Sequence, residues 1–431
     1  MGFYSHRKLN CLAGSILVIG TGLVVAGQYA TQKSIAQTAV ISINGAGAST
    51  VRTLFTGAEG TSVPTALAPT NSWFNTYGRA NSGSTPPAVN PPGPVNSSVT
   101  FRYASVGSSA GITSFLTQTP PPGTTTIAAP VSFAASDDPL VGPVTISSGP
   151  NLGPVVQVPV VGTGIVLAYN TTGLTIPLAG LRFSRATYLA ILNGSITNWN
   201  DIRIRNDNGG AIIAVNRPLV VVRRSDGSGT TFALSSHLRA AFGTAWNRGV
   251  GSISIAQSGA LPNPLPANTV VWPARFLSAS GGSAVADTIR ATPGAVGYVD
   301  SATRLAKTLP AAILQNKALA FVAASSTSIT AGFNGATDTD TDVRRIRLTV
   351  TDPAGTTAYP IITPTYLLLY SRYGNTNISS RIRGFVNWAL SATPAAAPLN
   401  PNTIATNRGY APLPATIKTS VRSVVGTYVT P

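Results

Sequence analysis

The sequence predicts an α/β protein, in which strands and helices pack in layers. Short β-rich apolar runs alternate with modest helical patterns along most of the chain. Glycine and proline are frequent, at 42 and 33 residues, whereas charged residues make up only 10% of the chain. This composition favours many turns and short elements. The 431 residues, 43% of them hydrophobic, are enough for two or three domains.

The apolar runs and the helical spacings place the elements in chain order. Strands are expected at 39–44, 99–105, 131–134, 156–161, 165–169, 219–223, 295–299, 346–350 and 366–370. Helices are expected at 185–192, 230–242, 283–291 and 379–390. Two proline-rich stretches, 83–95 and 117–126, predict surface loops.

Residues 1–36 have the pattern of a cleavable signal peptide. A basic start at 6–8 precedes an apolar run at 12–26, and 34–36 reads small-x-small. The run is shorter than the roughly 20 residues of a spanning helix, which argues against an uncleaved anchor. Cleavage removes Cys11 and leaves a net charge of +14. We therefore expect a secreted protein of the periplasm or cell envelope that has no cysteine.

The composition excludes several kinds of catalytic and metal sites. The chain has 12 acidic and 29 basic residues, and Glu59 is its only glutamate, so paired glutamates are excluded. Two histidines, His6 and His237, and the single Cys11 leave no material for metal clusters, thiol chemistry or disulfides. We therefore expect no cofactor and no metal.

Four segments carry small or hydroxyl side chains next to predicted strands. Three of them are glycine- and serine-rich turns that lead from a strand towards a helix, at 45–50, 105–111 and 224–231. In such turns glycine lets the backbone approach a ligand, and the next helix presents unpaired N–H groups and a partial positive charge. The fourth segment, 133–140, places Asp137 beside a strand in a chain that rarely uses carboxylates. The set suits a small anion.

Other interpretations of these motifs fit less well. The first turn lacks the third glycine of a dinucleotide fingerprint, and none of the turns has the lysine of a phosphate loop. The turn at 227–229 lacks the G-x-S-x-G spacing of a nucleophile elbow. His237 is interpreted as an ordinary helix-surface histidine, which argues against a serine hydrolase.

Three aspartates at alternate positions near residue 340 could suggest a calcium loop. They are Asp338, Asp340 and Asp342, but Val343 and Thr349 stand where such a loop needs glycine and glutamate. We therefore interpret this segment as an exposed acidic turn.

In content and order, the four segments resemble the substrate-binding protein of the phosphate-specific ABC transporter. The most specific part is Arg224 to Thr230, and the first turn departs from the family, with Ser49-Thr50-Val51 in place of threonine-phenylalanine-proline. Further agreeing stretches lie at 159–170, 191–201, 293–299, 359–366, 385–389 and 409–414, so the similarity spans nearly the whole mature chain.

The resemblance implies a two-lobed periplasmic-binding-protein fold of type II, a Venus flytrap whose ligand cleft lies between the lobes. Lobe I would comprise 37–163 plus 365–431, and lobe II would comprise 164–364, with crossings near 161–164 and 362–365. The implied phosphate-binding residues are Ser49, Thr50 through its N–H, Ser108, Asp137, Arg224, Ser228, Gly229 and Thr230. Asp226 would support them by orienting Arg224.

The resemblance also implies a monomeric, non-enzymatic protein that binds inorganic phosphate and delivers it to the membrane permease subunits of an ABC importer, without nucleic acid. One alternative is a DING-type phosphate-binding protein with phosphatase-like activity. Another is a basic surface protein that binds anionic polymers through its net charge. The arginines are scattered without aromatic interleaving, which favours a solvated basic surface.

Overall fold

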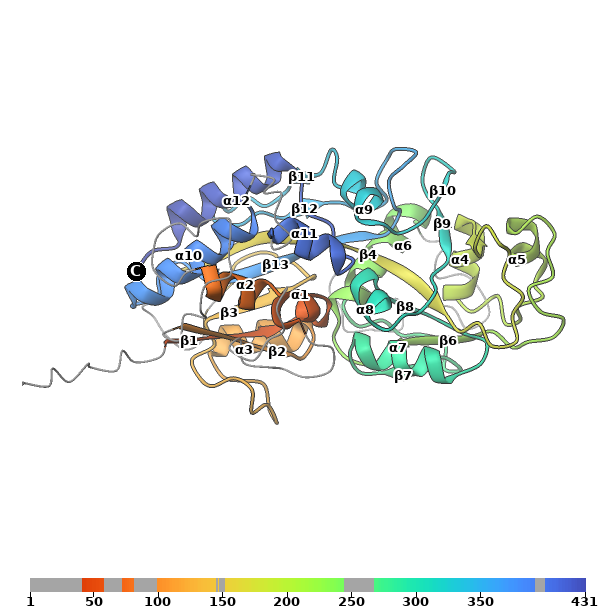
Figure 1. The fold of residues 1–431 in the computed structure, drawn as a ribbon, viewed down its shortest axis with the longest axis horizontal. Helices are drawn as coiled ribbons and strands as arrows, with labels where there is room; N and C mark the ends of the chain where they lie inside the picture. The colour runs from red at the N-terminus through yellow and green to blue at the C-terminus, as the bar shows by residue number, and fades with distance from the viewer. Residues whose placement is uncertain are drawn as a thin grey trace, which may run out of the picture. The chain divides into compact units, whose positions relative to one another are not determined.

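A mixed sheet of eight strands runs through the described part of the chain (Figure 1). The structure is a computed structural model that describes residues 41–57, 72–80, 99–144, 146, 152–243, 267–391 and 400–431. The strand order is β2-β1-β3-β13-β4-β8-β6-β7. The bounds are β1 Ile41–Gly47, β2 Val99–Ser105, β3 Phe133–Ser136, β4 Val155–Tyr169, β6 Val220–Arg224, β7 Leu277–Ala279, β8 Ala295–Asp300 and β13 Ile362–Tyr370.

Strand β4 joins the two halves of this sheet. Up to Gly164 it pairs with antiparallel β13, and from Ile165 onward it pairs with antiparallel β8. We call β2, β1, β3, β13 and residues 155–164 the first half-sheet. The second half-sheet consists of residues 165–169 with β8, β6 and β7. Each half contains three parallel strands, β2-β1-β3 and β8-β6-β7. The protein is therefore a two-lobed α/β fold, as expected.

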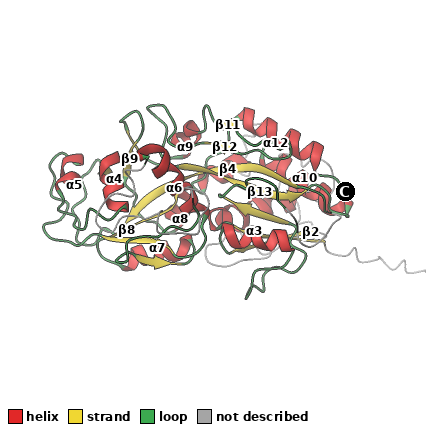
Figure 2. Ribbon diagram, turned by 180° about the vertical axis from the view of Figure 1, so that it is seen from behind, coloured by secondary structure: helices red, strands yellow, loops and turns green. Residues whose placement is uncertain are grey.

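Helices and minor strands complete the fold. The helices are η1 Ser49–Val51, α1 Arg52–Thr56, α2 Trp73–Ala80, α3 Ser108–Thr117, α4 Arg185–Leu192, α5 Ile202–Asp207, α6 Gly229–Phe242, α7 Gly282–Ala291, α8 Ser301–Ala306, α9 Ser326–Gly332, α10 Thr376–Ala389, α11 Pro401–Asn407 and α12 Ala415–Tyr428. The minor strands are β5 Arg182–Phe183, β9 Ile313–Gln315, β10 Phe321–Val322, β11 Thr337–Asp338 and β12 Leu348–Thr349. Helices α10 and α12 lie on one side of the first half-sheet and α3 lies on the other (Figures 1 and 2).

Most expected elements are present, and several bounds differ. Strand β2 and helix α4 have the expected bounds, whereas only Leu348–Thr349 of the expected segment 346–350 forms a strand. The expected strands 156–161 and 165–169 are one strand, because Gly162 and Gly164 are not turn residues. A Cβ on Gly162 would lie 2.4 Å from the ring of Phe333, so this glycine allows close packing against the strand.

The sequence patterns missed some helices, of which α12 is the longest. Its threonines, serines and valines have modest helix propensity. Ile417, Val421 and Val425 recur every four residues along it and are buried, and the helix packs on β4. Tertiary burial of this stripe, rather than propensity, stabilises the helix.

Three expectations concern segments outside or at the edge of these elements. The signal peptide 1–36 and the proline-rich stretch 83–95 lie outside the described residues. Residues 118–126 form the expected loop after α3. Across the described ranges, none of the helices is long and apolar enough to cross a bilayer.

An aromatic cluster packs on the first half-sheet. Phe55 of α1 stacks on Phe74 of α2 at 4.8 Å between ring centroids, and Phe385 of α10 lies 5.4 Å from Phe74. The ring of Phe133 occupies the space beside Gly45, where a Cβ would lie 2.1 Å from a ring carbon. Buried aromatic contacts of this kind hold β1 and the following turn in place.

Candidate functional site

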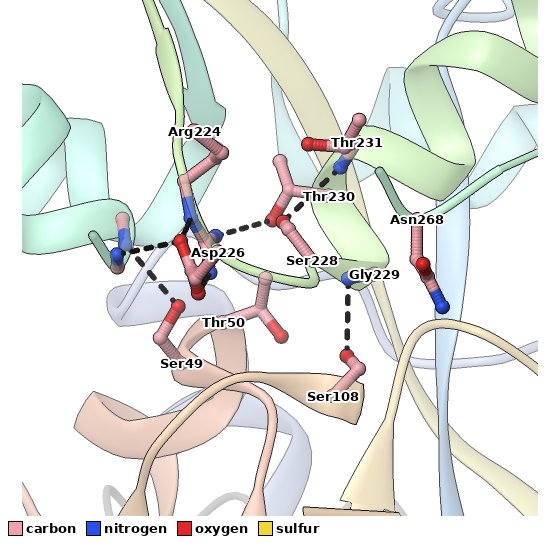
Figure 3. Close-up of polar contacts among 12 residues, drawn as sticks. Ser49, Thr50, Ser108, Arg224, Asp226, Ser228, Gly229, Thr230, Thr231 and Asn268 are labelled. Atoms are coloured by element: carbon pink, nitrogen blue, oxygen red, sulfur yellow. Dashed lines mark hydrogen bonds and ion pairs between the residues drawn. The ribbon is translucent and has the colours of Figure 1, made fainter. Parts of the chain in front are cut away.

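The site residues follow the carboxyl ends of the parallel strands in both half-sheets. Ser49 follows β1, Ser108 follows β2, and Asp137 follows β3 directly. On the second half-sheet, the segment 225–230 follows β6, and Gly281 follows β7. In open α/β sheets the carboxyl ends of the strands are where ligands bind. Hydrogen bonds between these segments bring the two half-sheets together here (Figure 3).

Asp137 is a buried carboxylate held by two threonines. Asp137 is only 1% exposed. The Thr50 hydroxyl lies 2.9 Å from both carboxylate oxygens, and the Thr365 hydroxyl donates to Oδ1 at 2.5 Å. Two hydroxyl hydrogens do not fill the roughly four acceptor positions of a carboxylate, so Asp137 can accept a further hydrogen bond from a ligand.

The pKa of the Asp137 carboxyl lies above its ordinary value. Burial raises the pKa of its carboxyl to about 6, although the hydrogen bonds from Thr365 and Thr50 and the charge of Arg224 act in the opposite direction. At pH 7 the group is therefore mostly ionised and remains an acceptor.

Arg224 is fixed by an ion pair on the opposite side of the site. Its Nε and Nη2 donate to Asp226 at 2.7 and 2.5 Å, and its Nη1 donates to the Thr230 hydroxyl at 3.4 Å. The pKa of Asp226 is lowered overall. Burial alone would raise it, but the hydrogen bonds and charge of Arg224 and the hydrogen bond from the Gly281 N–H outweigh burial. One N–H on each of Nη1 and Nη2 remains for an oxyanion.

Three helices point their N-termini at the site. Helices α3 and α7 have glycine N-caps, Gly107 and Gly281, without a side-chain cap. At α6, the Ser228 hydroxyl caps Thr231 N–H at 3.2 Å. First-turn N–H groups and the helix dipole favour an anion at such positions.

Two serines connect the half-sheets. The Ser108 hydroxyl accepts from Gly229 N–H at 3.2 Å and from Asp137 N–H at 3.3 Å, so its own hydrogen remains for another acceptor. The Ser49 hydroxyl accepts from Gly282 N–H at 3.4 Å. In Figure 3, Ser49, Ser108 and Thr50 lie on one side, and Arg224, Ser228 and Thr230 face them.

The structure brings all of the candidate site residues into one neighbourhood. Its first turn differs from expectation, because Gly45 to Gly47 continue β1 in register with β2 and β3. Only the residues from Ala48 onward form the turn.

Four further residues at the site carry no motif of their own. Thr363 and Thr365 lie at alternate positions of β13, and both contact Asp137. The Thr363 hydroxyl donates to the main-chain carbonyl of Asp137 at 3.4 Å, and the Thr365 hydroxyl donates to its carboxylate. The sequence feature that could have indicated them is a pair of threonine hydroxyls in an otherwise apolar strand. Gly282 and Asn268 have no comparable signal, because they reach the site only through the folded sheet.

His237 is not a surface residue, which corrects the interpretation from its helical position. It is 1% exposed, because α6 is covered on more than one side. Its Nε2 lies 2.9 Å from the Tyr188 hydroxyl, and Nδ1 lies 3.9 Å from Asp352. Burial lowers its pKa to about 4, so the ring is neutral. It lies apart from the residues of Figure 3 and pairs with a different cluster.

The acidic turn is neutralised by arginines. Asp342 accepts from Arg344 at 2.8 Å, and Asp340 accepts from Arg345 at 3.0 Å. Within the described ranges there is no group of three or more histidine, cysteine or acidic side chains arranged to hold a metal ion. The arrangement of hydroxyls, helix N-termini, one arginine and one free acceptor suits a small oxyanion that carries a hydroxyl.

Comparisons with known proteins show the family and the fold of the chain. A model described as a PBP superfamily domain matches residues 87–393. The phosphate-binding protein PstS of Pasteurella multocida is 28% identical over 315 residues, covering 73% of this chain and 78% of that protein. Alkaline phosphatase L of Pseudomonas aeruginosa is 27% identical over 321 residues, covering 68% and 74%. The solved structure of a high-affinity periplasmic phosphate-binding protein (PfluDING) has the same fold, with a TM-score of 0.61 at 19% identity over 89% of this chain and 93% of that one.

Proposed function

The chain belongs to the PBP superfamily, and we propose that it binds one inorganic phosphate between its two lobes and delivers it to an ABC importer. The observation that carries the proposal is Asp137, a buried acceptor placed opposite Arg224 among three helix N-termini. The related protein named PstS supports phosphate as the ligand.

The ligand set consists of the residues already brought together. Arg224 binds two phosphate oxygens through the N–H groups that Asp226 and Thr230 leave available. Ser108, Ser228 and Thr230 contribute hydroxyls, and Thr50 contributes its main-chain N–H. The Gly229 N–H, which donates to the Ser108 hydroxyl at 3.2 Å, would turn to phosphate when the ligand binds. Ser49 contributes its hydroxyl from the first turn. Because Asp226 pairs with Arg224, most of the anion's charge is stabilised by dipoles rather than by full charges.

Asp137 makes the site selective for phosphate. Phosphate near neutral pH keeps at least one hydroxyl, which donates to the carboxylate, whereas sulfate presents only lone pairs. A site that requires a ligand hydroxyl can reject an analogue that lacks it by about 10⁴ to 10⁵. The reason is that the buried acceptor is otherwise left unpaired.

The lobes are discontinuous in the chain. Lobe I comprises 37–163 with 365–431, and lobe II comprises 164–364. The change of pairing partner on β4 between Gly164 and Ile165 supports a crossing at this point. Residues 1–36 direct export to the periplasm or cell envelope, where the monomeric protein meets the permease subunits.

The protein acts by binding and release rather than by catalysis. The described residues next to Asp137 and Arg224 include no histidine or cysteine, and the one described histidine is neutral and bonded to Tyr188. A Ser228 nucleophile would need a base, and Ser228 instead caps α6.

Calorimetry on purified protein stripped of ligand tests the function. At pH 8 we expect one phosphate bound per chain and no displacement by sulfate at millimolar concentration. Equal displacement by both anions would remove the role assigned to Asp137, and an absence of phosphate binding would overturn the function itself.

A further inference from the structure

A second carboxylate, Asp138, lies beside Asp137 and makes a contact between the two half-sheets. Asn268 Nδ2 donates to Asp138 Oδ2 at 2.8 Å. Asp138 follows β3 of the first half-sheet, whereas Asn268 precedes β7 of the second. This contact involves none of the side chains assigned to phosphate.

Asn268 also holds the start of α6. Its main-chain carbonyl accepts from Ser228 N–H at 2.9 Å. Ser228 caps the helix and is followed by Gly229, whose N–H binds Ser108 across the interface. In Figure 3, Asn268 lies on the far side of Ser228 and Gly229 from Arg224 and Asp226. Asn268 therefore connects the N-terminus of α6 with Asp138, which follows the carboxyl end of β3.

The contact buries the carboxylate of Asp138, so the hydrogen bond from Asn268 is needed to offset the loss of its hydration. Burial raises the pKa of Asp138 to about 6, and the hydrogen bond from Asn268 opposes that rise. The charged group next to this pair is Asp137, whose pKa the charge of Asp138 raises and the charge of Arg224 lowers. Above this pKa the carboxylate is charged and would be hydrated if the half-sheets separated. When they are together, Asn268 is the one side chain among the described residues that donates to it.

We propose that Asn268 is a positioning residue that clasps the two lobes through Asp138 and so holds the α6 N-terminus over Asp137. The clasp rests on the proposed phosphate function, in which lobe closure retains the ligand. It acts on the closed state, so its loss speeds phosphate release more than it slows binding.

A side-chain swap tests the clasp without removing main-chain contacts. Asn268→Asp places two carboxylates face to face. At pH 8 we expect phosphate affinity to fall about ten- to a hundredfold, mainly through faster dissociation in stopped-flow measurements. Asp138→Asn keeps an acceptor opposite Asn268 and should bind nearly as the parent does. The double variant Asp138→Asn with Asn268→Asp reverses the donor and acceptor, and should restore binding.

The pH profile separates the clasp from a general structural role. At pH 5 the carboxylate introduced by Asn268→Asp can share a proton with that of Asp138. The loss of phosphate affinity, relative to the parent, should therefore be smaller than at pH 8. Small-angle scattering without ligand should show a larger radius of gyration for Asn268→Asp than for the swap at pH 8.

The outcomes are decisive. Parent-like dissociation of Asn268→Asp at pH 8, or failure of the swap to restore binding when all variants unfold at similar temperatures, overturns the clasp. If the parent binds no phosphate, the proposed function fails, and the scattering comparison alone decides whether Asn268 holds the lobes together.

Discussion

The hydroxyl of Ser108 accepts a hydrogen bond from the N–H of Gly229 at 3.2 Å, so α3 and α6 meet N-terminus to N-terminus. This contact joins the carboxyl end of β2 to the carboxyl end of β6. It also leaves no room for a side chain at residue 229. A Cβ there would lie 2.4 Å from the Ser108 Oγ and 2.7 Å from the Asp137 Cβ.

Gly229→Ala should therefore weaken phosphate binding by at least about tenfold while the protein remains folded. The added methyl prevents the close approach of α6 to Asp137, and position 229 is helical, where alanine is favourable. Gly426→Ala in α12 is the matched control, because its Cβ would meet no atom within 4 Å. Calorimetry and thermal unfolding on both variants check this. Equal binding by both would mean that the lobes do not close as tightly as described.

Sulfate should begin to compete with phosphate when the pH falls below the pKa of Asp137. Burial raises that pKa from 3.8 to about 6, so the carboxyl is mostly protonated at pH 5 and mostly ionised at pH 8. A protonated carboxyl can donate to a sulfate oxygen. Displacement calorimetry at the two pH values should show sulfate binding only at pH 5, and Asp137→Asn should bind sulfate at both. A pH-independent preference would contradict this assignment.

Stability should depend on pH through His237. Burial lowers its pKa from 6.5 to about 4, so the folded protein binds fewer protons than the unfolded chain between these values. The contribution is fully present above about pH 6.5 and is lost as the pH falls towards 4. At roughly 1.4 kcal/mol per pKa unit, the shift of about 2.5 units amounts to about 3.5 kcal/mol. Urea unfolding at pH 7.5 and 5 should show a smaller pH dependence for His237→Gln than for the parent.

Tyr188→Phe is the control for this measurement. It removes the 2.9 Å hydrogen bond to His237 Nε2 and keeps the titrating ring, so it should lower stability at both pH values. If His237→Gln and the parent lose stability equally on acidification, another group carries the effect.

Local sequence indicated the candidate site residues that follow strand ends, because hydroxyls, glycines and one carboxylate recur beside four predicted strands of a chain that has few charged residues. Arg224 and Asp226 belong to one such junction, and their ion pair spans only two residues. Thr365 and Asn268 could not be inferred in this way. They reach the site through pairings between segments far apart in the chain, such as β13 beside β3.

The fold was likewise predicted from local sequence only in part. Apolar runs indicated the strands of the sheet, but the shared strand β4 was divided at Gly162 and Gly164, since a glycine that permits close packing looks the same in sequence as one that turns the chain. The interpretation of His237 as a surface residue was wrong, because a position in a helix does not indicate how many other elements will cover that helix.

Purified protein should show no phosphatase turnover, although one relative is named alkaline phosphatase L. Ser228 caps α6 at Thr231, and the one described histidine is buried against Tyr188. Hydrolysis of p-nitrophenyl phosphate should not follow the protein through successive columns. Turnover at constant specific activity that disappears in Ser228→Ala would establish a catalytic role.

Arg224→Lys should weaken phosphate binding about ten- to a hundredfold with the fold intact. The guanidinium is almost fully buried and spans Asp226 and Thr230 with three of its N–H groups, which leaves two for the proposed ligand. Lysine keeps the charge but loses this planar fork. Loss of a charge-assisted hydrogen bond costs about 1.5–3 kcal/mol, at about 1.4 kcal/mol per decade of affinity.

Arg223→Lys is the neighbouring control for this change. Arg223 is only half-buried, and strand alternation turns it to the opposite face, where its Nη1 donates to the Arg224 carbonyl. Its replacement should leave affinity within about twofold, since most surface substitutions change free energies by less than about 0.5 kcal/mol. Calorimetry on the two single variants decides the register of the site. If Arg223→Lys is the damaging change, the anion lies on the other face of β6, and the ion pair with Asp226 serves the fold alone.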